Sequence, residues 1–179
     1  TNAIFSSLGM LTAGFVVGIL VKVVKNKRDI SKVGWFISGI IMFAMFFVSV
    51  ETNVMLFNIL TYFKLLFGHI GFITMFSMIP DCTEYTQLHY GLRASGIIFA
   101  ITNFAFKFAN AFCTGIFVSL LGAFGYVPGL ENQTPAVLTL CRAAITIMPA
   151  IALWIGAFLF SKYNITRDTH EATLKQLTA

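Results

Sequence analysis

The chain has 179 residues, of which 58% are hydrophobic and only 11% are charged, and its mean hydropathy is +0.84. Soluble domains of this length do not have such a composition, so the sequence indicates a membrane protein. The formal net charge of +5 does not indicate a nucleic-acid partner, because the basic excess lies in connections and in the tail, where it reflects membrane topology.

Five stretches are long and apolar enough to cross about 30 Å of hydrocarbon as helices. We therefore predict an all-α membrane protein with five transmembrane helices, followed by a cytoplasmic tail at residues 161–179. The predicted spans are residues 3–23, 33–50, 54–80, 93–123 and 137–160.

Charges in the connections predict the orientation, because connections rich in Lys and Arg face the cytoplasm. The second connection contains Glu51 and the fourth, residues 124–136, contains Glu131, and neither has a Lys or an Arg. Both are expected outside, which places the N-terminus outside and the C-terminus in the cytoplasm. The basic residues near the first connection are Lys22, Lys25, Lys27, Arg28 and Lys32, and those after the last span are Lys162, Arg167 and Lys175.

The start of the chain does not resemble a natural N-terminus. Thr1 replaces the usual Met, and neither a basic leader segment nor a small-residue cleavage site is present. With an odd number of spans and an outside N-terminus, we expect a fragment whose upstream helices are missing.

The third predicted span carries a polar stripe. Asn58, Tyr62 and His69 are spaced at i, i+4 and i+11 on one helical face, while Lys64 lies off that face near mid-span. The stripe either lines a transport cavity or bonds to neighbouring helices, as polar residues in membranes commonly do. Lys64 has the further alternative of pairing with an acid on the absent helices.

The connection at residues 80–93 holds two acids, a histidine and an arginine. If this segment is helical, Asp81 and Glu84 share a face. Together with Arg93 they would form a salt-bridge network that opens and closes a cytoplasmic gate. The alternative is an ordinary solvated loop whose charges help to set topology.

The fourth predicted span has a lysine near its middle. Lys107 shares one helical face with Asn103, Asn110 and Thr114. A cation at bilayer depth costs about 3 kcal/mol or more unless it faces protein or water, so these residues predict a transport site. The alternative is a lysine tied to a neighbouring helix for packing only.

The sequence gives little support to catalysis or metal binding. Cys82, Cys113 and Cys141 are far apart and form no metal-ligand spacing. Nucleophile-elbow, zinc-protease and phosphate-loop motifs are absent from the sequence. We therefore expect neither an enzyme, nor a metal site, nor a bound cofactor.

The charged connection resembles the segment between helices ten and eleven of the glycoside-pentoside-hexuronide:cation symporters, in its pattern Asp81-x-x-Glu84-Tyr85 followed by Gly91-x-Arg93. The resemblance is specific over about the last hundred residues and less specific in the first two spans. Thr86, His89 and Tyr90 depart from the family pattern, which leaves the ion and the sugar open. The further matching positions are Lys107, Gly125-Tyr126-Val127-Pro128, Glu131-Asn132-Gln133 and Pro149.

The resemblance implies helices eight to twelve of a twelve-helix carrier, and thus part of the C-terminal six-helix bundle of a major-facilitator-type transporter in a bacterial inner membrane. Such a carrier moves a glycoside, pentoside or hexuronide with Na+ or H+ by alternating access. It implies that Lys107 neighbours an acidic cation site on the missing N-terminal helices, and that Asp81, Glu84 and Arg93 hold the inner side closed. The alternatives are a non-transporting sensor or scaffold and an inactive truncated carrier.

Overall fold

A computed structural model describes residues 2–24, 26–48, 53–91, 94–130 and 132–163, together with residues 169 and 173. The regular elements in this part of the chain are all helices. They are α1 (Asn2–Val23), α2 (Lys27–Phe47), α3 (Val54–Ser77), α4 (Ile79–Tyr90), α5 (Ser95–Ala123), α6 (Pro135–Ile145) and α7 (Ile147–Phe160).

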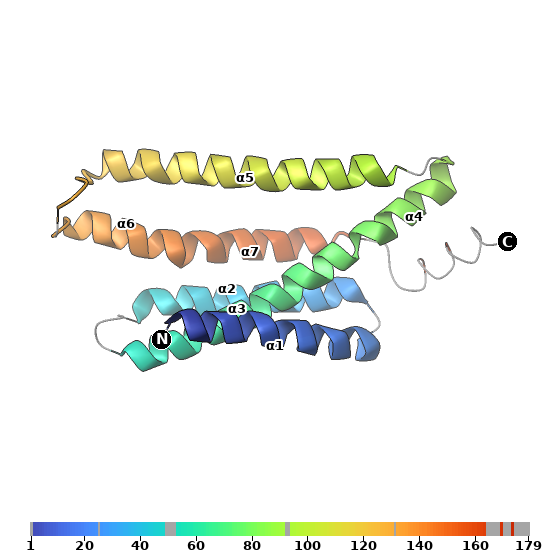
Figure 1. Cartoon of the computed structure of the whole chain (residues 1–179), viewed down its shortest axis with the longest axis horizontal. Helices are drawn as coiled ribbons and strands as arrows, with labels where there is room; N and C mark the ends of the chain where they lie inside the picture. The colour runs from blue at the N-terminus through green and yellow to red at the C-terminus, as the bar shows by residue number, and fades with distance from the viewer. Residues whose placement is uncertain are drawn as a thin grey trace.

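The helices form five rods that are long and apolar enough to cross a membrane, which confirms the predicted all-α class and number of spans. Helices α3 and α4 make one rod, and α6 and α7 make another. Figure 1 shows the rods side by side, with α5 along one edge, α1 along the opposite edge, and α6–α7 and α2 between them. Helix α4 leaves this layer obliquely and leads to the start of α5.

Two prolines explain why two of the rods are broken. Pro80 lies at the start of α4 and Pro149 at the start of α7. Proline lacks the backbone N–H, and its ring clashes with the carbonyl group four residues earlier, so α3 and α6 end just before it. At the second break the Thr146 hydroxyl donates to the Arg142 carbonyl oxygen at 2.6 Å, which satisfies one acceptor at the end of α6.

Two helices differ in extent from the predicted spans. Helix α2 begins at Lys27 rather than at residue 33, with Asp29 in its first turn, where an acid complements the helix dipole. The segment after residue 80, for which the sequence left a loop or a helix open, is helix α4 as far as Tyr90. Gly91 ends this helix with φ +67°, a left-handed conformation that glycine adopts without strain.

Helix α3 lies between α1 and α2 and approaches both of them at glycines. A Cβ atom on Gly9 would lie 2.7 Å from the Tyr62 carbonyl oxygen, and one on Gly34 would lie 2.8 Å from the Phe67 carbonyl oxygen. Small residues allow backbones to approach this closely in membrane bundles. A compact core therefore forms around α3, and its buried cluster comprises Ala13, Val17, Ile30 and Ile70.

The indole ring of Trp35 on α2 joins α3 to α7. A Cβ atom on Gly71 would collide with the ring, and one on Gly156 would lie 2.8 Å from it. The Phe160 ring meets the indole ring edge-on, with 5.1 Å between centroids. Trp35 therefore needs a glycine on each of the two neighbouring helices.

Helix α5 packs against the other described helices much less than they pack against one another, and none of its residues is buried. It touches α3 through Phe106, whose ring centroid lies 5.4 Å from that of Phe76 and 5.9 Å from that of Phe72. In a membrane protein, apolar faces of this kind contact lipid or further protein. The large exposed side chains of α5 include Phe104, Phe108 and Phe112.

Candidate functional site

The polar stripe predicted around Lys107 lies on α5, and all four of its side chains are exposed. Asn103 and Asn110 donate from their amide nitrogens to carbonyl oxygens of the same helix, at 2.9 and 3.0 Å. Lys107 has no ion pair or hydrogen bond from its ammonium group within the described ranges. The stripe, which also includes Thr114, is therefore open to a partner outside these ranges.

In the predicted α3 stripe, Asn58 is buried and Tyr62 contacts α1. Asn58 is buried, with 3% of its surface exposed. The Tyr62 hydroxyl donates to the Thr12 hydroxyl oxygen at 3.2 Å, and α1 and α5 lie at opposite edges of the layer (Figure 1). The Tyr62 contact is of the kind that packs neighbouring helices, and the predicted cavity that Asn58 and Tyr62 would share with Lys107 stays a prediction.

Lys64 and His69 instead line a common cavity of about 500 Å³ between α2, α3 and α7. His69 Nδ1 lies 2.9 Å from the Leu65 carbonyl oxygen; it donates there, which leaves Nε2 for another partner. No ion pair or hydrogen bond holds the Lys64 ammonium group among the residues that the structure describes. The walls include Trp35, Ser38, Met42, Phe72, Pro149 and Leu153.

Lys64 and His69 do not share one helical face, but both line this cavity because it covers a wide arc of α3 from Lys64 to Phe72. The lysine side chain is long enough to reach this cavity, whereas a shorter side chain at the same position would not. The result is an ammonium group and an imidazole at mid-span in one largely apolar space, where charged groups mark functional sites.

The predicted gate contains an ion pair that sequence reasoning missed. Lys27 Nζ, at the start of α2, lies 2.8 and 2.9 Å from the two carboxylate oxygens of Asp81 on α4. The same ammonium group donates to the Ser77 carbonyl oxygen at 3.2 Å. Because Asp81 is only 8% exposed, its carboxylate is shielded from water, and the pair ties the start of α2 to the break between α3 and α4.

Glu84, another predicted gate residue, lies further along α4 than Asp81. Glu84 lines a small cavity of about 160 Å³ between α4 and the start of α5, together with Ser95 and Phe99. Arg93 lies outside the described residues. The only sequence signal for Lys27 is its place in the basic first connection, which by itself indicates topology.

The same end of the bundle is also joined through Tyr163, just after α7. Arg28 Nη1 donates to the Tyr163 carbonyl oxygen at 3.0 Å, and the Tyr163 hydroxyl lies 3.5 Å from Cys82 Sγ. Burial raises the pKa of the Tyr163 hydroxyl above its usual range, and Cys82 and the Asp81 carboxylate raise it further. Helices α2, α4 and α7 therefore meet in one polar cluster.

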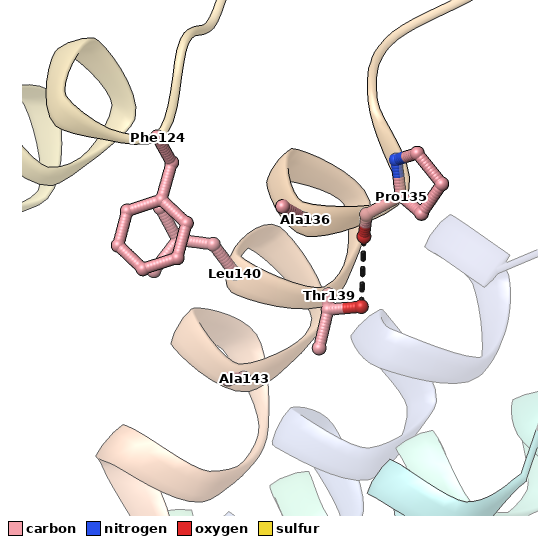
Figure 2. Close-up of a pocket in the computed structure, with 6 residues that line it drawn as sticks. All are labelled: Phe124, Pro135, Ala136, Thr139, Leu140 and Ala143. Atoms are coloured by element: carbon pink, nitrogen blue, oxygen red, sulfur yellow. Dashed lines mark hydrogen bonds between the residues drawn. The ribbon is translucent and has the colours of Figure 1, made fainter.

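A further cavity lies near the opposite end of the bundle, beside the end of α5. It has a volume of about 460 Å³ and no charged lining residue. Figure 2 shows the Phe124 ring beside Leu140, with the Thr139 hydroxyl turned to the Pro135 carbonyl oxygen, to which it donates at 2.8 Å. The polar group is thus already satisfied, and the cavity offers an apolar surface only.

Comparison with known proteins identifies the family. The family model described as MFS/sugar transport protein matches residues 2–167. The chain belongs to this family. The MFS/sugar transport proteins are a family of transporters rather than of enzymes, and the five apolar helices are those of a multi-pass membrane protein.

Three relatives are named as symporters. The chain is 28% identical to the "Inner membrane symporter YicJ" of Escherichia coli over 140 aligned residues. This alignment covers 78% of this chain and 30% of that protein. It is 32% identical over 103 residues to the "Uncharacterized symporter YnaJ" of Bacillus subtilis, covering 58% and 22% of the two chains. It is 30% identical over 115 residues to the "Uncharacterized symporter sll1374" of Synechocystis, covering 62% and 21%. The chain thus spans less than a third of the length of these relatives.

Proposed function

We propose that the protein containing this chain is a symporter that moves a glycoside, pentoside or hexuronide together with Na+ or H+ by alternating access. The observation that carries the proposal is the match of residues 2–167 to the MFS/sugar transport proteins. The names of the three relatives support coupling to an ion, and the resemblance around Asp81 and Lys107 supports the sugar class. The partners proposed for this chain are the bilayer, the remaining helices of the carrier and the sugar.

In this proposal Lys107 senses the coupling cation electrostatically. Its exposed position on α5 allows helices of the carrier outside this chain to bring carboxylates next to it. Opposite charges 4 Å apart attract by about 4 kcal/mol at the effective dielectric of a protein. A cation that occupies those carboxylates weakens their attraction for the Lys107 ammonium group, and this difference links ion binding to the position of α5.

Lys64 is proposed to pair with another acid of the carrier at the cavity it shares with His69. The ammonium group has no anionic partner among the described residues, and an unpaired cation is costly at mid-membrane. The cavity of about 500 Å³ leaves space for a carboxylate from another helix. Such a pair would fix where that helix packs.

The ion pair between Lys27 and Asp81 is proposed to be part of the cytoplasmic gate, with Glu84 and Arg93. Alternating access requires contacts that form in one state and break in the other. This pair joins α2 to α4, and α4 leads directly into α5. Its release would free α5, which carries Lys107.

We place the carrier in a bacterial inner membrane, with the end where α2 begins and α7 ends in the cytoplasm. The support is the concentration of basic residues there. The start of α1, at the other end, then faces outward.

Uptake by the full-length carrier in proteoliposomes tests the proposal. One labelled glycoside, pentoside or hexuronide should accumulate under an imposed gradient of Na+ or H+. Lys107→Ala should abolish accumulation, whereas the control Lys22→Ala, which removes the same charge from the last turn of α1, should retain it. Absence of gradient-driven uptake for the whole panel would refute symport of these sugars, and unchanged uptake by Lys107→Ala would refute its coupling role.

A further inference from the structure

A groove outside the proposed transport site runs between α2 and α7. It has a volume of about 430 Å³. Along most of its length the walls are apolar and aromatic, and the Trp154 indole N–H donates to the Phe36 carbonyl oxygen at 3.3 Å. The apolar wall residues include Phe36, Trp154, Ala157 and Phe158.

One end of this groove is basic. Lys32 and Ser161 line it there, and Lys162 follows directly, with its Nζ 6.0 Å from the centroid of the Phe158 ring. Both lysines are exposed, and neither forms an ion pair with a residue that the structure describes. The nearby Asp29 carboxylate accepts a hydrogen bond from Arg28 Nε at 3.4 Å. Its charge is therefore already paired with Arg28 and not with either lysine.

The basic end of the groove lies at the ends of two membrane-spanning helices, where headgroups are expected. Helix α2 begins at Lys27 and α7 ends at Phe160, and these two ends are joined by the Arg28 bond to the Tyr163 carbonyl oxygen. Trp154 is six residues before the end of α7, or about 9 Å deeper at 1.5 Å per residue. The groove thus changes from cationic to apolar in the direction in which a bilayer changes from headgroup to acyl chain.

We propose that this groove binds an anionic phospholipid. The phosphate lies between the ammonium groups of Lys32 and Lys162, and one acyl chain runs along Phe36, Trp154 and Phe158. Basic residues between helices at one membrane face attract anionic headgroups, and lysine stems follow apolar walls while their charges stay at the interface. The lipid is a bound component and not a transported one, so this site is independent of the proposed symport.

Quenching of Trp154 by brominated lipid tests the proposal. The whole protein is placed in nanodiscs with Trp35 kept, because its ring packs α2 against α3 and α7, and with the tryptophans outside this chain replaced by phenylalanine. The signal of Trp154 is the difference between this protein and its Trp154→Phe variant. Phosphatidylglycerol and phosphatidylcholine, each brominated on the acyl chains, are added separately to an unbrominated phosphatidylcholine background. Phosphatidylglycerol should quench Trp154 with a severalfold higher relative affinity, and Lys32→Gln should reduce this preference about fivefold, the effect expected of one basic residue near a charged surface.

Lys22→Gln is the matched control, because it removes the same charge from the last turn of α1, away from the groove. The Lys22→Gln variant should prefer phosphatidylglycerol as strongly as the parent does. Inorganic phosphate should not displace the lipid from the groove. Quenching by phosphatidylcholine should be the same in both variants and the parent, which shows that the groove is intact. Equal quenching by the two lipids in the parent, or an equal loss in Lys22→Gln and Lys32→Gln, would overturn the proposal. Absence of quenching by either lipid would show that protein covers the groove, which would also overturn it.

Discussion

The ion pair between Lys27 and Asp81 allows a quantitative prediction. At 2.8 Å and an effective dielectric of 20, two unit charges attract by about 6 kcal/mol. Desolvation cancels most of this attraction, because the Asp81 side chain is only 11% exposed and that of Lys27 is 31% exposed. Fully exposed pairs contribute up to about 1 kcal/mol, whereas loss of one partner of a buried pair costs about 3–5 kcal/mol. For this intermediate case we expect a coupling free energy of about 2 kcal/mol.

A double-mutant cycle of Lys27→Ala and Asp81→Ala measures that coupling through thermal unfolding in detergent. Asp81→Ala should lower Tm by about 4–8 °C, taking about 2–4 °C per kcal/mol for a chain of this size. The second replacement should then add little. The matched control is the pair Arg28 and Asp29, which is longer at 3.4 Å and more exposed. If both cycles give the same coupling, below about 1 kcal/mol, the assignment of Lys27–Asp81 as a shielded structural tie is wrong.

Two further predictions concern packing and pH. Gly34→Val should lower Tm by several degrees, because a Cβ atom there would lie 2.8 Å from the Phe67 carbonyl oxygen and overpacking costs about 1–3 kcal/mol. The control is Gly14→Val, because a Cβ atom on Gly14 would meet nothing within 4 Å. An equal loss of Tm in both variants would contradict this account of the α2–α3 contact. The raised pKa of Tyr163 means that folding favours the neutral hydroxyl. Its contribution to stability is complete below about pH 10, the ordinary tyrosine pKa, and is lost as the pH rises beyond it. Tm measured from pH 8 to 11 should therefore fall less in Tyr163→Phe than in the parent, and parallel curves would disprove the effect.

The number of membrane spans could be predicted from the sequence because it depends on local properties, namely apolar length and the polarity of the connections. The course of the segment after residue 80 could not. Its low hydrophobicity suggested a connection, but Pro80 is tolerated in the first turn of a helix and Gly91 provides a natural end. The helix therefore continues as α4 despite its charges.

The candidate site was less accessible to sequence reasoning because its contacts join residues far apart in the chain. Periodicity does not show that Lys64 and His69 share a cavity, because they lie on different faces of α3 and the cavity has walls from α2 and α7 as well. Lys27 and Asp81 are 54 positions apart, and only the packing of α2 against the α3–α4 break brings them together. The roles of Lys107, Asn103, Asn110 and Thr114 stay predictions, since those side chains project from a helix that the described residues leave uncovered.

The position of Trp35 between Gly71 and Gly156 has a consequence for how this protein can change during evolution. A larger residue at either glycine would collide with the indole ring, and a smaller residue at position 35 would leave a void between α2, α3 and α7. The three positions therefore share one fixed volume. Among homologues, we expect a side chain larger than glycine at position 71 or 156 to occur together with a smaller residue at position 35.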